Sequence, residues 1–354
     1  MYIVVAILIF GILIIIHELG HFIAAKRFGV KVNEFAFGMG PKLWSFKRGE
    51  TVYALRLLPI GGACVMEGED EDNPDPRAFN AQKRWKRVII LAAGAFMNFL
   101  FGLIVVLLLN IGTARIVDTT LVGFQPDFPG QGAGGLMVGD TIHSINGERT
   151  YYVNDFSLFM DMPAAKDGVV DLVVMRDGEK VKLPDFELGL REYMIDGELQ
   201  MRYGVVFQAV EPTFGARLNY SLYTAMNYVR LVRVGLVQLI GGDVSVTEMA
   251  GPVGIVATIN ESAHDPYYKT VKERLASVFN IGAFIAMNLA VMNLLPIPAL
   301  DGGRIFGIVV TFIIEKITRR RVNPKYEGYI HAGGLALLLV FAVVIMVSDI
   351  IKLF

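Results

Sequence analysis

Two histidines and a glutamate stand inside an apolar run near the start of the chain. In the motif HELGH, His17 and His21 are four residues apart and Glu18 follows the first histidine. Residues four apart share one face of an α-helix, so both imidazoles can turn a ring nitrogen toward one metal ion. Glu18 lies about 100° further around the helix, from where it can reach a water on that ion. The spacing is typical of zinc hydrolases.

Two histidines leave a catalytic zinc short of one protein ligand. Asp301 is the leading candidate, because it ends an apolar run at a depth that matches the histidines. On its own, the aspartate in ALDGG is better explained as a turn residue, and only its pairing with an incomplete HELGH favours a ligand. His331 is a weaker candidate, and His143 and His264 are expected in polar outer regions.

The stretch NLLPIPALDGG, residues 293–303, predicts an interrupted helix. Pro296 and Pro298 lack backbone donors and cannot continue a regular helix. Unwound backbone at membrane depth is tolerated where it is buried in protein or lines a wet cavity. Asn293 and the freed carbonyls are candidates for holding a substrate strand, and a simple kink is the alternative. Asn98 either faces the same site or packs between helices.

The composition indicates a membrane protein. The 354 residues are 54% hydrophobic and only 19% charged, with a net charge of −1. This charge argues against nucleic acid as a partner, because such binding needs concentrated basic surface. The single cysteine, Cys64, excludes an intramolecular disulfide framework and a cysteine-rich metal site.

Four segments have the length and apolarity of membrane-spanning helices. They are residues 2–25, about 88–111, the proline-broken 277–314 and about 330–347. The first is too long for a signal-peptide core and lacks a basic region before it, so we expect it to be retained. A weaker segment, about 222–240, carries Arg230 and Arg233 and is better explained as an amphipathic helix.

Basic residues predict the orientation. Residues 26–87 hold twelve Lys and Arg, and residues 316–327 hold five. The positive-inside rule assigns both loops to the cytoplasm, which leaves both termini and residues 112–276 on the outer face. The HELGH motif and Asp301 then both lie near the inner face.

The polar stretches suggest two further parts. Residues 30–66 alternate polar and apolar side chains, which predicts β-hairpins near the inner face. Residues 113–208 hold short strand-like runs and the turns INGE and RDGE, which predict a small β-rich domain. The fold class is thus mainly helical with an inserted outer domain. The expected divisions are 1–112 (membrane), 113–210 (inserted domain), 211–276 (amphipathic linker) and 277–354 (membrane).

Taken together, these motifs resemble the site-2 protease family of intramembrane zinc metalloproteases, peptidase family M50. The likeness is greatest to the bacterial, regulator-of-sigma-E protease-like branch with a PDZ domain. HELGH and NLLPIPALDGG are similar to the two hallmark motifs, GLMVGDTIHSING (135–147) to a PDZ turn, and MAGPVGI (249–255) to a further family element. Two positions depart from the family pattern. Ala95 precedes Asn98 where the family often has proline, and Ala63-Cys64 follow Gly62 where the family usually has Tyr-Val. Only one PDZ-like unit is present.

The resemblance implies His17, His21 and Asp301 as ligands of one Zn²⁺ and Glu18 as the catalytic base. It also implies cleavage of peptide bonds within or near transmembrane helices in a bacterial inner membrane. Typical family substrates are single-span proteins such as anti-sigma factors, and remnant signal peptides. The PDZ-like unit would bind peptide C-termini or exclude large substrates. Two alternatives are an ion or proton transporter with a His/Glu/Asp relay and an inactive PDZ-bearing scaffold.

Overall fold

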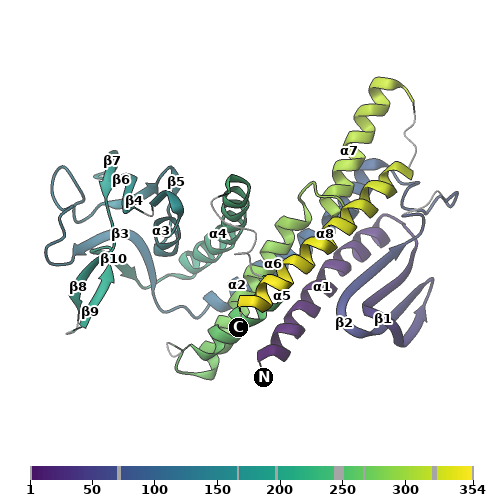
Figure 1. Cartoon of the computed structure of the whole chain (residues 1–354), viewed down its shortest axis with the longest axis horizontal. Coiled ribbons are helices and arrows are strands. Elements are labelled where there is room, and N and C mark those ends of the chain that lie inside the picture. Colours follow the sequence, from purple (N-terminus) through teal and green to yellow (C-terminus); the bar gives the residue numbers. More distant parts are fainter. Residues whose placement is uncertain are drawn as a thin grey trace. The chain divides into compact units, whose positions relative to one another are not determined.

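The chain folds into two compact units (Figure 1). The computed structural model describes residues 2–69, 73–165, 167–195, 198–242, 251–265, 268–320 and 325–352. The first unit combines Met1–Val106 with Tyr228–Phe354, and the second comprises Leu107–Asn227. The second unit is therefore inserted between the two halves of the first.

Helices make up most of the first unit. They are α1 (Tyr2–Arg27), α2 (Arg84–Asn110), α4 (Phe214–Gly241), α5 (Pro252–His264), α6 (Val271–Asn293), α7 (Asp301–Thr318) and α8 (Lys325–Lys352). The end of α2 and the first half of α4 belong to the second unit. Within the described residues, four stretches are long and apolar enough to cross a membrane: Ile7–Arg27, Arg84–Asn110, Val271–Asn293 and Gly328–Asp349. They correspond to the four segments predicted from sequence, as expected for a hydrocarbon core that about 20 apolar residues span.

The interruption predicted within 277–314 lies between α6 and α7. α6 begins at Val271, earlier than predicted, because Thr270 and Glu273 form a reciprocal capping box. It ends at Asn293, and the two prolines follow in a non-helical stretch before α7 begins at Asp301. The proline positions therefore predicted the break correctly.

A further helix, α5, is present where the sequence indicates only an amphipathic linker. The backbone N–H groups of Gly251 and Gly254 donate to the carboxylate of Asp349 on α8, at 3.2 and 2.8 Å. This carboxylate supplies the acceptors that the first turn of a helix lacks. Because the capping residue is almost 100 residues away in the sequence, no local sequence pattern predicts where α5 begins. The MAGPVGI element lies only partly within the described residues, which resume at Gly251.

The predicted β-region is a single pair of long, bent strands, β1 (Val32–Arg48) and β2 (Thr51–Met66). Glu34 pairs with both Val65 and Val52, so the start of β1 lies between the two halves of β2. The resulting order of half-strands is 62–66, 32–37, 51–56 and 42–48. Among the described residues, 62–66 is thus an edge strand, which we call the β2 edge.

The second unit contains an antiparallel sheet in the order β10-β3-β4-β6-β7, with β5 paired to β4. Its elements are β3 (Ile116–Phe124), β4 (Thr141–Ile145), β5 (Glu148–Arg149), α3 (Val153–Met160), β6 (Val169–Arg176), β7 (Glu179–Glu187), β8 (Arg191–Ile195), β9 (Glu198–Arg202) and β10 (Val205–Val210). The predicted Asn146-Gly147 and Asp177-Gly178 turns are confirmed, with positive φ at all four residues.

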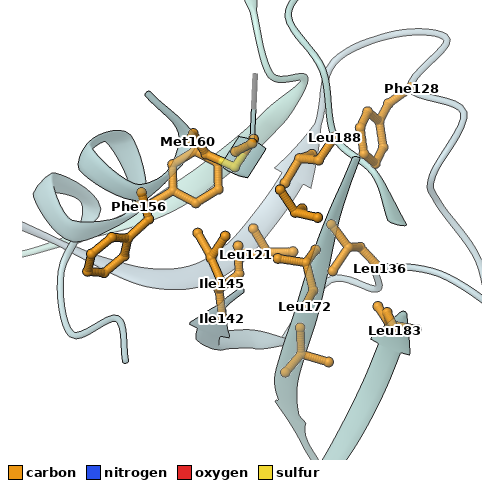
Figure 2. Packing of buried hydrophobic residues seen from close by; sticks show 14 residues of the cluster. Leu121, Phe128, Leu136, Ile142, Ile145, Phe156, Met160, Leu172, Leu183 and Leu188 are labelled. Atoms are coloured by element: carbon orange, nitrogen blue, oxygen red, sulfur yellow. The ribbon is translucent and has the colours of Figure 1, made fainter. Parts of the chain in front are cut away.

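This sheet and α3 enclose one apolar core (Figure 2). Side chains from β3, β4 and β6, including Leu121, Ile142 and Leu172, meet Phe156 and Met160 of α3. Beside the core, Asp140 is almost fully buried and accepts hydrogen bonds from the Met137 N–H and the Arg176 guanidinium. The second unit therefore has a core of its own, as a separate domain requires.

In the first unit, α1 and α2 approach closely at Gly20. A Cβ atom there would lie 2.3 Å from the carbonyl oxygen of Ala93, so only glycine fits without movement. Apolar residues of α1, α2, α7 and the β-region pack around this contact. They are Ala25, Val30, Val32, Cys64, Met66, Phe79, Ile90, Leu91 and Ile308.

We expect Gly20→Ala to destabilise the protein and Gly235→Ala to be neutral or stabilising. In a helix interior, alanine in place of glycine raises the free energy of unfolding by up to about 1 kcal/mol. Overpacking lowers it by about 1–3 kcal/mol. A Cβ at Gly235, in α4, would meet open space. Thermal unfolding of both variants in detergent measures the difference, and equal melting temperatures would contradict the packing account.

Candidate metal centre

The structure brings His17, His21 and Asp301 together, although 280 residues separate the last two. One Asp301 carboxylate oxygen, Oδ2, lies 3.1 Å from His17 Nε2 and 3.4 Å from His21 Nε2. The two Nε2 atoms are 3.2 Å apart. The three side chains thus present three potential ligand atoms at the corners of a nearly equilateral triangle. We call these atoms, His17 Nε2, His21 Nε2 and Asp301 Oδ2, the three-atom cluster.

The size of this triangle fits a zinc ion. Tetrahedral zinc holds nitrogen and oxygen ligands at about 2.0–2.1 Å, which places neighbouring ligand atoms about 3.3 Å apart. The observed separations of 3.1, 3.2 and 3.4 Å scatter around that value. Asp301 Oδ2 is also buried, and apart from its approach to the two imidazole nitrogens it has no hydrogen-bond partner within the described part of the chain. A buried carboxylate oxygen needs a compensating partner, and a cation held by all three atoms would provide one.

Polar neighbours fix the orientation of both imidazoles. The Nδ1–H of His21 donates to the backbone oxygen of Ile90 on α2 at 2.8 Å, which leaves Nε2 as the free ligand atom. The side-chain amide of Asn293 lies 3.4 Å from His17 Nδ1. Because half a turn of an amide exchanges its oxygen and nitrogen, Asn293 can accept a hydrogen from this atom.

Glycine on α2 leaves room for the imidazoles. A Cβ at Gly94 would lie 2.4 Å from His21 Nε2 and 2.7 Å from His17 Cε1. One turn further along α2, Asn98 is 1% exposed, and its Oδ1 has no hydrogen-bond partner among the described residues. The backbone of α2 therefore forms one wall of the cluster.

A cavity of about 270 Å³ opens beside the three-atom cluster. Residues predicted as site residues line it: His17, Glu18, His21, Asn293 and Asp301. The other three, Asn98, Pro296 and Pro298, are not among its lining residues. Glu18 lies against the β2 edge, since a Cβ at Gly62 would be 3.0 Å from its Cγ.

Outside the 293–303 stretch, sequence reasoning missed five lining residues: Cys64 and Met66 on the β2 edge, Glu69 after it, Leu91 on α2, and Arg304 on α7. Burial, followed by the negative charge of Glu18, raises the pKa of the Cys64 thiol, which keeps it protonated. Arg304 directly follows the LDGG motif and Glu69 begins an acidic loop, so only their proximity to known motifs could have indicated them.

The remaining histidines have other surroundings. His143 lies in the second unit beside Arg149, and His264 Nδ1 contacts the Asn260 carbonyl oxygen at the end of α5. His331 belongs to α8, but its side chain lies outside the described part of the chain.

Comparison with known proteins gives one consistent result. Residues 5–341 match the protein family described as "Peptidase family M50". A Clostridium acetobutylicum protein named as a zinc metalloprotease is 35% identical, covering 99% of this chain and 97% of its own. The zinc metalloprotease RasP of Bacillus licheniformis is 28% identical, and the regulator of sigma-W protease RasP of Bacillus subtilis 27%; each alignment covers 98% of both chains. The match includes both helices that carry the three-atom cluster, and this chain belongs to peptidase family M50, the site-2 protease family.

Proposed function

We propose that this protein is an intramembrane zinc endopeptidase in which His17, His21 and Asp301 hold the metal and Glu18 is the catalytic base. The observation that carries the proposal is the triangle of ligand atoms, whose sides of 3.1–3.4 Å suit one tetrahedral zinc. When bound, zinc supplies a Lewis acid that polarises the scissile carbonyl and makes water acidic enough to lose a proton near neutral pH.

Glu18 is the residue that moves protons. Its side chain lines the cavity next to the two histidines without joining the three-atom cluster. From there its carboxylate takes a proton from the attacking water and delivers it to the nitrogen of the leaving amine. A carboxylate that ligated the metal directly would be less able to accept that proton.

The substrate is a peptide strand from a transmembrane segment. The β2 edge, next to Glu18, offers unpaired backbone groups for strand addition. The non-helical residues 294–300, on the side of Asp301, offer further backbone groups. Asn293, Pro296 and Pro298 contribute by shaping this segment, and Asn98 contributes from the buried face of α2. A helical substrate must unwind locally before its carbonyl can reach the metal, because both faces recognise extended backbone.

The second unit acts as a PDZ-like module that faces the outside of the cell. Its end strand β10 pairs with β3, and Phe207 of β10 packs on Phe156 of α3, with ring centroids 4.9 Å apart. An edge strand beside a helix is the arrangement with which PDZ domains bind peptide C-termini. The basic loops 26–87 and 316–327 support the corresponding placement of the metal site toward the cytoplasm of a bacterial inner membrane. Anti-sigma factors and remnant signal peptides are the substrate classes we propose.

Glu18→Gln is expected to abolish cleavage of a single-span substrate while zinc remains bound. The amide keeps the size of the side chain but cannot accept the proton, and loss of a general base costs about 10²–10⁴-fold in rate. Purified variants in detergent or nanodiscs would be compared by gel-based cleavage and metal analysis. Glu261→Gln, on exposed α5 surface, is the control. Wild-type rates in Glu18→Gln would refute the assignment of the base.

His21→Ala and Asp301→Asn are expected to lose the metal. Each removes one of three ligand atoms, so zinc content should fall from about one per chain to a small fraction after dialysis against a weak chelator. His264→Ala should retain it, because that ring lies on α5 away from the cluster. Zinc retention in both ligand variants would exclude this site.

A further inference from the structure

An ion pair to which the proposed function gives no role lines the cavity. Arg304 Nη1 donates to Glu69 Oε1 at 2.6 Å. The side chains are only 25% and 19% exposed, and both line the cavity that contains His17 and Glu18. At this degree of burial the pair is better shielded from water than a surface salt bridge.

The two residues come from segments of the chain that are far apart in the sequence. Arg304 lies on the first turn of α7, three residues after Asp301. Glu69 comes three residues after the end of β2, and its backbone oxygen accepts a hydrogen bond from the Asn80 side chain. The pair therefore connects the helix that carries Asp301 to the segment that directly follows the β2 edge.

We propose that Arg304 and Glu69 are positioning residues that fix the distance between the β2 edge and residues 294–301, and so the width of the slot for a substrate strand. This inference rests on the proposed function, because it assigns the slot to peptide substrate. Strands in a sheet lie about 4.8 Å apart, so an added strand requires an edge held at a defined distance from the opposite wall. A shift of about 1 Å in a bound substrate can cost about a hundredfold in rate.

Cys64 provides a direct measure of this slot. It is the only cysteine in the chain, lies on the β2 edge and lines the same cavity, yet it is only 8% exposed. A small water-soluble thiol reagent should reach it faster when the slot widens. If the ion pair limits the width of the slot, the rate at which Cys64 reacts reports a change of width without any need for proteolysis.

The experiment compares Glu69→Gln, Arg304→Gln and Arg304→Lys in the purified full-length protein. We expect both glutamine variants to react with a methanethiosulfonate reagent about ten- to a hundredfold faster at Cys64, the effect of losing one charge-assisted hydrogen bond. The negative charge of Glu69 also raises the pKa of the Cys64 thiol, so Arg304→Gln, which keeps this carboxylate, is the variant that separates widening of the slot from a change in thiol pKa. Their kcat should fall by about tenfold or more with zinc content unchanged. Arg304→Lys retains the charge and should restore most of both properties.

Glu67→Gln is the matched control. Glu67 is two residues from Glu69 and pairs with Lys31 at 2.8 Å, but it does not line the cavity. This variant should react and cleave like the wild type. Unchanged Cys64 reactivity in both glutamine variants, or a loss of zinc from them, would overturn the positioning role. If the wild type itself fails to cleave substrate while both glutamine variants still label faster than it does, the result counts against the proposed function and not against the positioning role, so the two failures are distinguishable.

Discussion

The whole site depends on how closely the backbone of α2 approaches α1. Gly20 on one helix and Gly94 on the other leave no side chain between them, and a Cβ at either position would overlap a neighbouring atom at 2.3–2.4 Å. The same approach carries the Ile90 carbonyl oxygen to within 2.8 Å of His21 Nδ1. The close packing of α1 on α2 and the orientation of the His21 imidazole therefore depend on the same helix contact, and an added methyl group would disturb both.

The break between α6 and α7 makes the third corner of the triangle available. It lets Asp301 stand at the first turn of a helix, where the helix dipole favours a negative charge. Gly302 and Gly303 allow the preceding loop to fold back, since a Cβ at either would lie 2.2 Å from a carbonyl oxygen of that loop. The prolines prevent a continuous helix, and the glycines leave room for the loop to fold back against the start of α7. Both are needed for this arrangement.

Much of this arrangement could be predicted because its signals are local or periodic. The spacing of His17 and His21 follows helical geometry, and the depth of Asp301 follows from loop charges and helix lengths. Cys64, Glu69 and Arg304 could not be found this way, because their proximity depends on how β1 and β2 bend. A strand that pairs twice, as residues 34–37 do, has the same alternation of side chains as one that pairs once.

The cap on α5 has a practical consequence for anyone who handles this protein. One carboxylate near the end of α8, that of Asp349, accepts hydrogen bonds from two backbone N–H groups at the start of α5. Truncation of the chain before this residue, or an affinity tag spliced in its place, would leave those donors without acceptors. Purification handles therefore belong beyond the last helix, or in the loops of the inserted unit, if the helical part is to keep its assembly.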